Sequence, residues 1–330
     1  MMDISVYFEP VSPKTPEIHE EYRPGKFGDN IRIFKEKGDF PSLEDTDIAI
    51  IGVKEDRNTL NNHGAALAPD YVRNYFYQLF HTPGKARIVD LGNIVRGNET
   101  QDTYFAVKNV VSELLKSNII PVIIGGTQDL TFANYLAYDS LGQIINIAAV
   151  DARFDIGKAG QEEITSNAYL SKIIMHQPNV LFNYTNIGYQ TYFVDRDAVD
   201  LMGKLYFDAY RLGVVRANLE EVEPMVRNAD LLSFDISSIR QSDAPGNANA
   251  SPNGFYGEEA CQIVRYAGLS DKLTSIGFYE LNPNLDKDGQ TAHLVAQMIW
   301  HFIDGFYNRK LDFPLKEKDP EDFHLSFSKM

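Results

Sequence analysis

Runs of consecutive apolar residues alternate with amphipathic stretches along most of the chain. Each run is short, is rich in Ile, Val and other residues that favour strands, and ends at glycine or polar residues. Continuous apolar runs of this length are typical of strands that are buried on both faces of a sheet. We expect eight such strands, at residues 46–53, 86–92, 119–126, 144–151, 185–190, 205–212, 231–237 and 274–281.

The segments between these runs have apolar residues at helical spacing, most clearly at 102–117 and 289–307. Strands that alternate with helices form a parallel sheet covered by helices on both faces, so the pattern predicts an α/β fold. Because the alternation continues as one series, we expect a single domain over residues 1–330. This domain would have an N-terminal flank, a core and a C-terminal tail, at residues 1–45, 46–309 and 310–330.

Composition narrows the classes of partner. The chain has 330 residues and a formal net charge of −15, which argues against binding to nucleic acid or to an anionic membrane. We find no apolar stretch long enough to span a membrane and no signal peptide at the start of the sequence. The single cysteine, Cys261, excludes an internal disulfide framework and a cysteine-based zinc site. We therefore expect a cytoplasmic protein.

Polar residues follow several of the predicted strands, at the edge of a parallel sheet where ligands and catalytic groups collect. Asp151 and Asp155 follow one strand, Asp235 ends another, and Glu280 lies at the end of a third. A single aspartate at such a place more often caps the following helix. Three aspartates that meet at one edge, beside a glycine turn at 125–126, favour a site for one divalent cation.

Several segments resemble motifs of the ureohydrolase superfamily of arginase, agmatinase and formiminoglutamase. They are GGTQ (125–128), DARFD (151–155), DIS (235–237) and APG (244–246), with IGVKEDRNTLNNHGAALAPDYVR (51–73), DLGNI (90–94) and FYELNP (278–283). The motifs keep the family's order over roughly residues 46–309, and the EDR and NNHGA segments are most similar to the formiminoglutamase branch. The resemblance implies a three-layer α/β/α arginase-like fold, an eight-stranded, mainly parallel sheet and a homo-oligomer.

The resemblance also implies two manganese ions that share a bridging hydroxide, held by four carboxylates and two histidines. Three carboxylates are kept here, whereas both histidines and one carboxylate are replaced. In chain order, the matching positions are Gln128, Asp151, Arg153, Asp155, Asp235 and Ser237. The family's proton-shuttling histidine has no counterpart in residues 164–172.

Arg153 decides how much of this metal centre can remain. Arginine stays protonated in proteins and offers no lone pair, so it cannot coordinate a metal. We therefore expect the second ion to be lost and the first, at Gln128, Asp151, Asp155 and Asp235, to be in doubt. In its place we predict that the guanidinium of Arg153 forks into Asp151 and Asp235 as an internal counter-ion. The alternative is that Arg153 turns outward to solvent.

Two further residues concern a ligand. Glu280 stands where the family holds a glutamate that grips the substrate's guanidinium-like group, so it either belongs to a surviving pocket or is satisfied by local amides. His63 lies in a loop that the family places near the pocket mouth and is a candidate for a minor binding role. A small amidine or guanidino compound would be the ligand.

These residues lead to two hypotheses about function. In the first, the chain is a ureohydrolase-like protein without catalysis or a cofactor, which binds, scaffolds or regulates a protein partner. In the second, it is a C–N hydrolase of linear amidines with an atypical site for one manganese or other divalent ion. The replacements at Gln128, Arg153 and Ser237 favour the first hypothesis.

Overall fold

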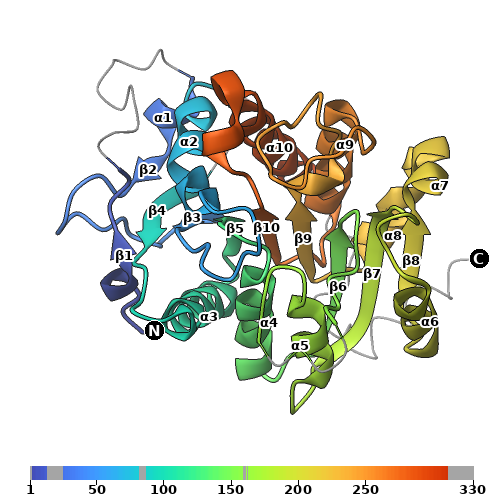
Figure 1. The fold of residues 1–330 in the computed structure, drawn as a ribbon. Coiled ribbons are helices and arrows are strands. Elements are labelled where there is room, and N and C mark those ends of the chain that lie inside the picture. The colour runs from blue at the N-terminus through green and yellow to red at the C-terminus, as the bar shows by residue number, and fades with distance from the viewer. Residues whose placement is uncertain (1, 13–24, 82–86, 159–160, 162, 311–330) are drawn as a thin grey trace, which may run out of the picture.

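A computed structural model describes residues 2–12, 25–81, 87–158, 161 and 163–310. In this part of the chain, ten strands form one sheet with helices on both faces (Figure 1). The strands are β1 (Phe8–Glu9), β2 (Arg32–Ile33), β3 (Ile48–Val53), β4 (Ile88–Ile94), β5 (Ile120–Ile124), β6 (Ile145–Val150), β7 (Leu181–Tyr189), β8 (Asp208–Arg211), β9 (Leu231–Asp235) and β10 (Ser275–Tyr279).

The sheet runs in the order β1-β4-β3-β5-β10-β9-β6-β7-β8, and β2 also pairs with β4. β1 is antiparallel to β4, and the other pairs are parallel, so the predicted α/β fold with a mainly parallel sheet is confirmed. The prediction of eight strands is wrong, because β1 and β2 in the N-terminal flank also join the sheet. These two strands have only two residues each, which is too short to produce a recognisable hydrophobic pattern.

Alternate residues of the central strands pack into different cores, as strand geometry requires. In β3, Ile48 and Ile50 belong to one hydrophobic cluster, whereas Ala49, Ile51 and Val53 belong to another on the opposite face. Burial on both faces explains why the central strands appear in the sequence as uninterrupted apolar runs.

One face of the sheet is covered by helices whose buried residues form a cluster with β3, β5, β6, β9 and β10. These helices are α1 (Phe27–Asn30), α2 (Ala68–Phe76), α7 (Leu212–Ala217), α8 (Val222–Arg227), α9 (Gly257–Leu269) and α10 (Gln290–Tyr307). The other face is covered by α3 (Thr100–Lys116), α4 (Leu130–Ser140), α5 (Tyr169–Met175) and α6 (Arg196–Lys204). Among the helices described, none is both long and apolar enough to cross a membrane.

The chain segments outside the central sheet are only partly described. Residues 25–45 place Phe27 in the core, where its ring stacks on Phe76 with the centroids 4.4 Å apart. The predicted C-terminal tail falls almost wholly on residues 311–330, which lie outside the described part of the chain. The single domain over residues 1–330 stays a prediction.

Candidate functional site

Three aspartates meet at the carboxyl ends of two neighbouring strands. Asp235 is the last residue of β9, and Asp151 directly follows β6, which pairs in parallel with β9. Asp155 lies four residues further along and has a left-handed backbone (φ 49°), which turns the chain back toward the strand end. One carboxylate oxygen from each of the three lies within 4.8 Å of the others, and all three side chains are buried. This aspartate cluster has the size and chemistry of a site for one cation.

Burial governs the acid–base behaviour of the aspartate cluster. It raises the pKa of Asp155 to about 7 and the pKa of Asp151 and Asp235 above their ordinary range. Repulsion from Asp155 and Asp235 raises the pKa of Asp151 further. The metal-free cluster therefore keeps protons at neutral pH.

Oδ2 of Asp151 and Oε1 of Gln128 are among the buried oxygen atoms of this region that have no hydrogen-bond partner. The amide nitrogen of Gln128 donates to the hydroxyl groups of Tyr169, at 3.3 Å, and Ser233, at 3.2 Å. Its oxygen is left as a free acceptor. A buried acceptor without a donor is costly, so each of these oxygens has a lone pair that suits a cation. Carboxylate and amide oxygens suit a hard divalent ion such as Mg²⁺, Ca²⁺ or Mn²⁺.

The glycine turn places Gln128 beside the cluster. A Cβ atom on Gly126 would lie 1.7 Å from the backbone oxygen of Glu55, so only glycine fits here. The N–H of Gly126 donates to the carbonyl of Val53, and the N–H of Thr127 donates to the carbonyl of Glu55. The turn is thereby fixed against the loop that follows β3.

The predicted fork of Arg153 into Asp151 and Asp235 is wrong. The guanidinium instead stacks over the ring of Phe193, with its carbon 4.5 Å from the ring centroid. No hydrogen bond or ion pair joins it to a carboxylate in the described part of the chain. The backbone explains this direction, because the N–H of Arg153 donates to Asp151 at 2.7 Å and its carbonyl accepts from Asn186 at 2.7 Å.

The alternative, in which Arg153 turns outward, is met in part, because the side chain is half-buried and lies over Phe193 instead of entering the cluster. Its charge acts on the cluster without contact and lowers the pKa of Asp155 and Asp235 against the effect of burial. Arg153 is therefore a remote counter-charge at the rim of the aspartate cluster.

Ser237 holds Asp235 within the turn after β9. Its hydroxyl donates to Oδ2 of Asp235 at 2.6 Å, and its N–H donates to Oδ1 at 2.7 Å. This pair closes the short turn after β9. The hydrogen bonds also favour the ionised form of Asp235 against the effect of burial.

Glu280 is satisfied by local amides. Its carboxylate accepts from the N–H of Gln128 at 2.9 Å and from the side chain of Asn62 at 2.8 Å, and the residue is 3% exposed. Burial, with repulsion from Asp235, raises its pKa to about 8. The side chain of His63, one residue after Asn62, is exposed.

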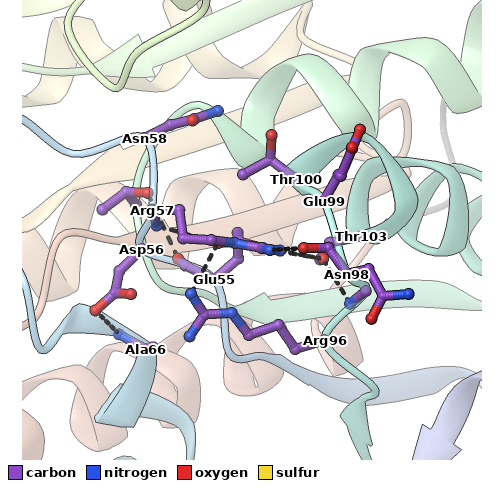
Figure 2. Close-up of polar contacts among 12 residues, drawn as sticks. Glu55, Asp56, Arg57, Asn58, Ala66, Arg96, Asn98, Glu99, Thr100 and Thr103 are labelled. Carbon is purple, nitrogen blue, oxygen red and sulfur yellow. Dashed lines mark hydrogen bonds and ion pairs between the residues drawn. The ribbon is translucent and has the colours of Figure 1, made fainter.

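The ion pair between Glu55 and Arg57, which holds the loop after β3, was not predicted from the sequence. Glu55 is fully buried, and its carboxylate accepts from Nε of Arg57 at 2.9 Å and from the hydroxyl of Thr103 at 2.9 Å (Figure 2). Arg57 also donates to the carbonyl of Asn98 (Figure 2). Both residues belong to the EDR segment, so the signal was present, but the partners in α3 and the segment before it are more than 40 residues away.

Comparisons with known proteins agree with this fold. A family model described as "Arginase family" matches residues 46–304. A formimidoylglutamase of Staphylococcus haemolyticus is 27% identical over 271 residues, which cover 78% of this chain and 86% of the relative. A formimidoylglutamase of Staphylococcus aureus is 25% identical over 279 residues, covering 81% and 88%.

Solved structures show the same fold. The formiminoglutamase of Trypanosoma cruzi with Mn²⁺ has a TM-score of 0.73 at 20% identity, covering 81% of this chain and 96% of that one. The formimidoylglutamase of Bacillus subtilis has a TM-score of 0.72 at 18% identity, covering 83% and 94%.

Proposed function

The chain belongs to the arginase family, nearest its formiminoglutamase members, and from this premise we propose that it binds one divalent cation and lacks two-metal hydrolysis. The ion would be held by Asp151, Asp155 and Asp235, with the amide oxygen of Gln128. The protein would then act as a binding or regulatory member of the family. A homo-oligomer or a protein partner stays a prediction.

The observation that carries this proposal concerns Arg153 and Ser237, which replace two ligands of the family's second ion. Arg153 has no lone pair to offer and stacks on Phe193, while Ser237 offers only a neutral hydroxyl, held on Asp235, in place of a carboxylate. The two-metal mechanism of the family needs ligands at both positions. A second ion would also lie near a fixed positive charge, which opposes its binding.

The first ion is supported by the unpartnered oxygens of Asp151 and Gln128. A divalent ion there would act as a Lewis acid and balance the charge of the carboxylates. The chain's own residues shape the rest of the site. Gln128 keeps its oxygen free by donating its nitrogen to Tyr169 and Ser233.

Glu280 does not support the grip on a cationic substrate that the family would imply. Its pKa of about 8 leaves it largely protonated at neutral pH, and both its oxygens already accept hydrogen bonds. A neutral carboxyl attracts a guanidinium far less than a carboxylate does. A small amidine ligand would therefore depend on the aspartate cluster more than on Glu280.

The second candidate is a hydrolase of linear amidines with one metal ion. The three buried carboxylates of Asp151, Asp155 and Asp235 favour it, because an ion that they hold would supply Lewis-acid catalysis. This candidate needs turnover with one ion per chain.

Isothermal titration with Mn²⁺ and a hydrolysis assay on arginine, agmatine and formiminoglutamate test the proposal together. We expect one ion per chain in the wild type, no binding in Asp235→Asn, and no hydrolysis in either. Hydrolysis that depends on manganese and is lost in Asp235→Asn would establish the second candidate. Two ions per chain would contradict both.

A further inference from the structure

The guanidinium of Arg153 has donors without acceptors. It carries five N–H groups. None of them makes a hydrogen bond or an ion pair with another residue in the described part of the chain, although the side chain is half-buried. It is held by its stack on Phe193 and by the two backbone hydrogen bonds to Asp151 and Asn186. A positioned guanidinium with free donors is suited to bind an anion.

The donors of Arg153 face the aspartate cluster across a gap. Asp151 is two residues away in the sequence, and its Oδ2 atom accepts no hydrogen bond from an N–H or hydroxyl group, although its carboxyl interacts with that of Asp155. The charge of Arg153 reaches Asp155 and Asp235, yet each carboxylate stays outside ion-pair distance. The site therefore has an acidic centre and a cationic rim that do not neutralise each other by contact.

We propose that Arg153 and the cation of the aspartate cluster together bind a small carboxylate, so that the carboxylate and the cation strengthen each other's binding. This inference rests on the single-cation site proposed above. A carboxylate accepts two parallel hydrogen bonds from a guanidinium and can also coordinate a divalent ion.

Direct coordination gives the coupling its sign. Without the cation, a carboxylate can bind only to the guanidinium of Arg153, and any ionised aspartate of the cluster repels it. With the cation, the carboxylate can also coordinate the ion, so it gains a second favourable contact. By linkage, a ligand that binds better in the presence of the cation must tighten the binding of the cation by the same factor.

Arg153 has a separate effect on the cation alone. Its positive charge opposes a divalent ion as long as no anion lies between them. Removal of this charge should therefore tighten cation binding in the absence of a carboxylate, while it abolishes the coupling. A structural role for Arg153 would not produce these two opposite changes.

The test is isothermal titration of Mn²⁺ into the full chain in chloride buffer, with and without saturating acetate. In the wild type we expect acetate to lower the Kd for Mn²⁺ about fivefold or more. Acetamide, which is neutral and of similar shape, should leave the Kd unchanged. In Arg153→Gln, acetate should have no effect, and the Kd without acetate should be lower than in the wild type.

Two further variants complete the design. Arg153→Lys keeps the positive charge but cannot donate two parallel hydrogen bonds to a carboxylate, so it should keep only part of the coupling. Arg211→Gln is the matched control, because Arg211 also lies over an aromatic ring, 5.9 Å from the centroid of Tyr189, and does not affect the pKa of the three aspartates. In this control, acetate should lower the Kd for Mn²⁺ by the same factor as in the wild type.

The outcomes separate the two proposals. Equal tightening by acetate in Arg153→Gln and the wild type would overturn the role of Arg153. If Mn²⁺ binds to the wild type and acetate has no effect, the coupling is wrong and the single-cation site stands. If Mn²⁺ does not bind to the wild type, the single-cation site fails and the coupling falls with it.

Discussion

Ser237 donates two hydrogen bonds to Asp235, from its hydroxyl to Oδ2 at 2.6 Å and from its N–H to Oδ1 at 2.7 Å. The family motif implies a metal-binding carboxylate where this hydroxyl lies. The contact satisfies Asp235 within its own turn. A neutral hydroxyl thus stands where the second half of a binuclear site would have a carboxylate.

Restoration of the missing ligands should restore the second ion. The double variant Arg153→His and Ser237→Asp supplies an imidazole nitrogen and a fourth carboxylate. We expect the Mn²⁺ content to rise from one ion per chain to two, as measured by native mass spectrometry. Each single variant is the control and should remain at one ion, because half of the missing ligands is still absent. One ion in the double variant would mean that other residues exclude the second metal.

The aspartate cluster should make the metal-free protein less stable as pH rises. The pKa of Asp155 rises from 3.8 to about 7 on folding, so the native state binds more protons than the unfolded state between these values. The free energy of unfolding therefore falls as pH increases from about 4 through 7, by up to several kcal/mol at about 1.4 kcal/mol per pKa unit. Urea unfolding at several pH values in the presence of a chelator measures this.

Asp155→Asn is the matched variant for this experiment. Asparagine has the same shape, cannot ionise and tolerates the left-handed backbone at this position. Its unfolding free energy should fall less steeply between pH 5 and pH 8. A wild type and a variant with the same slope would show that the cluster does not titrate in this range.

Binding of Mn²⁺ should strengthen with increasing pH. Metal ligands must be deprotonated, and burial raises the pKa of Asp151, Asp155 and Asp235, that of Asp155 to about 7. Each displaced proton tightens the apparent Kd by up to roughly tenfold per pH unit below the pKa. Titration calorimetry at pH 6 and pH 8, in two buffers of different ionisation enthalpy, gives both the affinity and the protons released. Binding without proton release would contradict the raised pKa values.

The buried pair of Glu55 and Arg57 should contribute strongly to stability. Burial acts to raise the pKa of Glu55, but hydrogen bonds from Arg57 and Thr103 and the charge of Arg57 outweigh it, so the pKa is lowered. Arg57→Ala removes the main partner of a buried charge, leaving it Thr103 and the more distant Arg96, at 4.0 Å, and should cost about 3 kcal/mol at pH 7. The loss should shrink as pH falls and Glu55 becomes protonated. Thermal and urea unfolding at pH 7 and pH 4 measure the effect.

Arg227→Ala is the control for this pair. Arg227 donates to Glu223 at the surface of α8, where an ion pair contributes less than about 1 kcal/mol. Equal losses in Arg57→Ala and Arg227→Ala would mean that water reaches Glu55.

The fold could be predicted from the sequence where the signal is local. The apolar runs of β3, β5, β9 and β10 indicate strands because burial on both faces removes polar residues from them. The helices α3 and α10 begin and end within two residues of the predicted ranges. The two-residue strands of the N-terminal flank carry no such pattern.

The site could be predicted only in part. The meeting of Asp151, Asp155 and Asp235 follows from strand order and the shared edge of a parallel sheet. The direction of the Arg153 side chain depends on its contact with Phe193, 40 residues away in the sequence, and on two hydrogen bonds that fix its backbone. The hydrogen bonding of the Glu280 carboxyl depends on Asn62, which is 218 residues away in the sequence. Contacts of this kind have no local signal.

Anomalous diffraction from crystals of the wild-type protein soaked in Mn²⁺ tests the central claim most directly. We predict one manganese peak per chain, bounded by Asp151, Asp155, Asp235 and the amide oxygen of Gln128. The guanidinium of Arg153 should remain outside ligand distance of the metal. Two manganese peaks per chain, with the second beside Ser237 and Arg153, would contradict it.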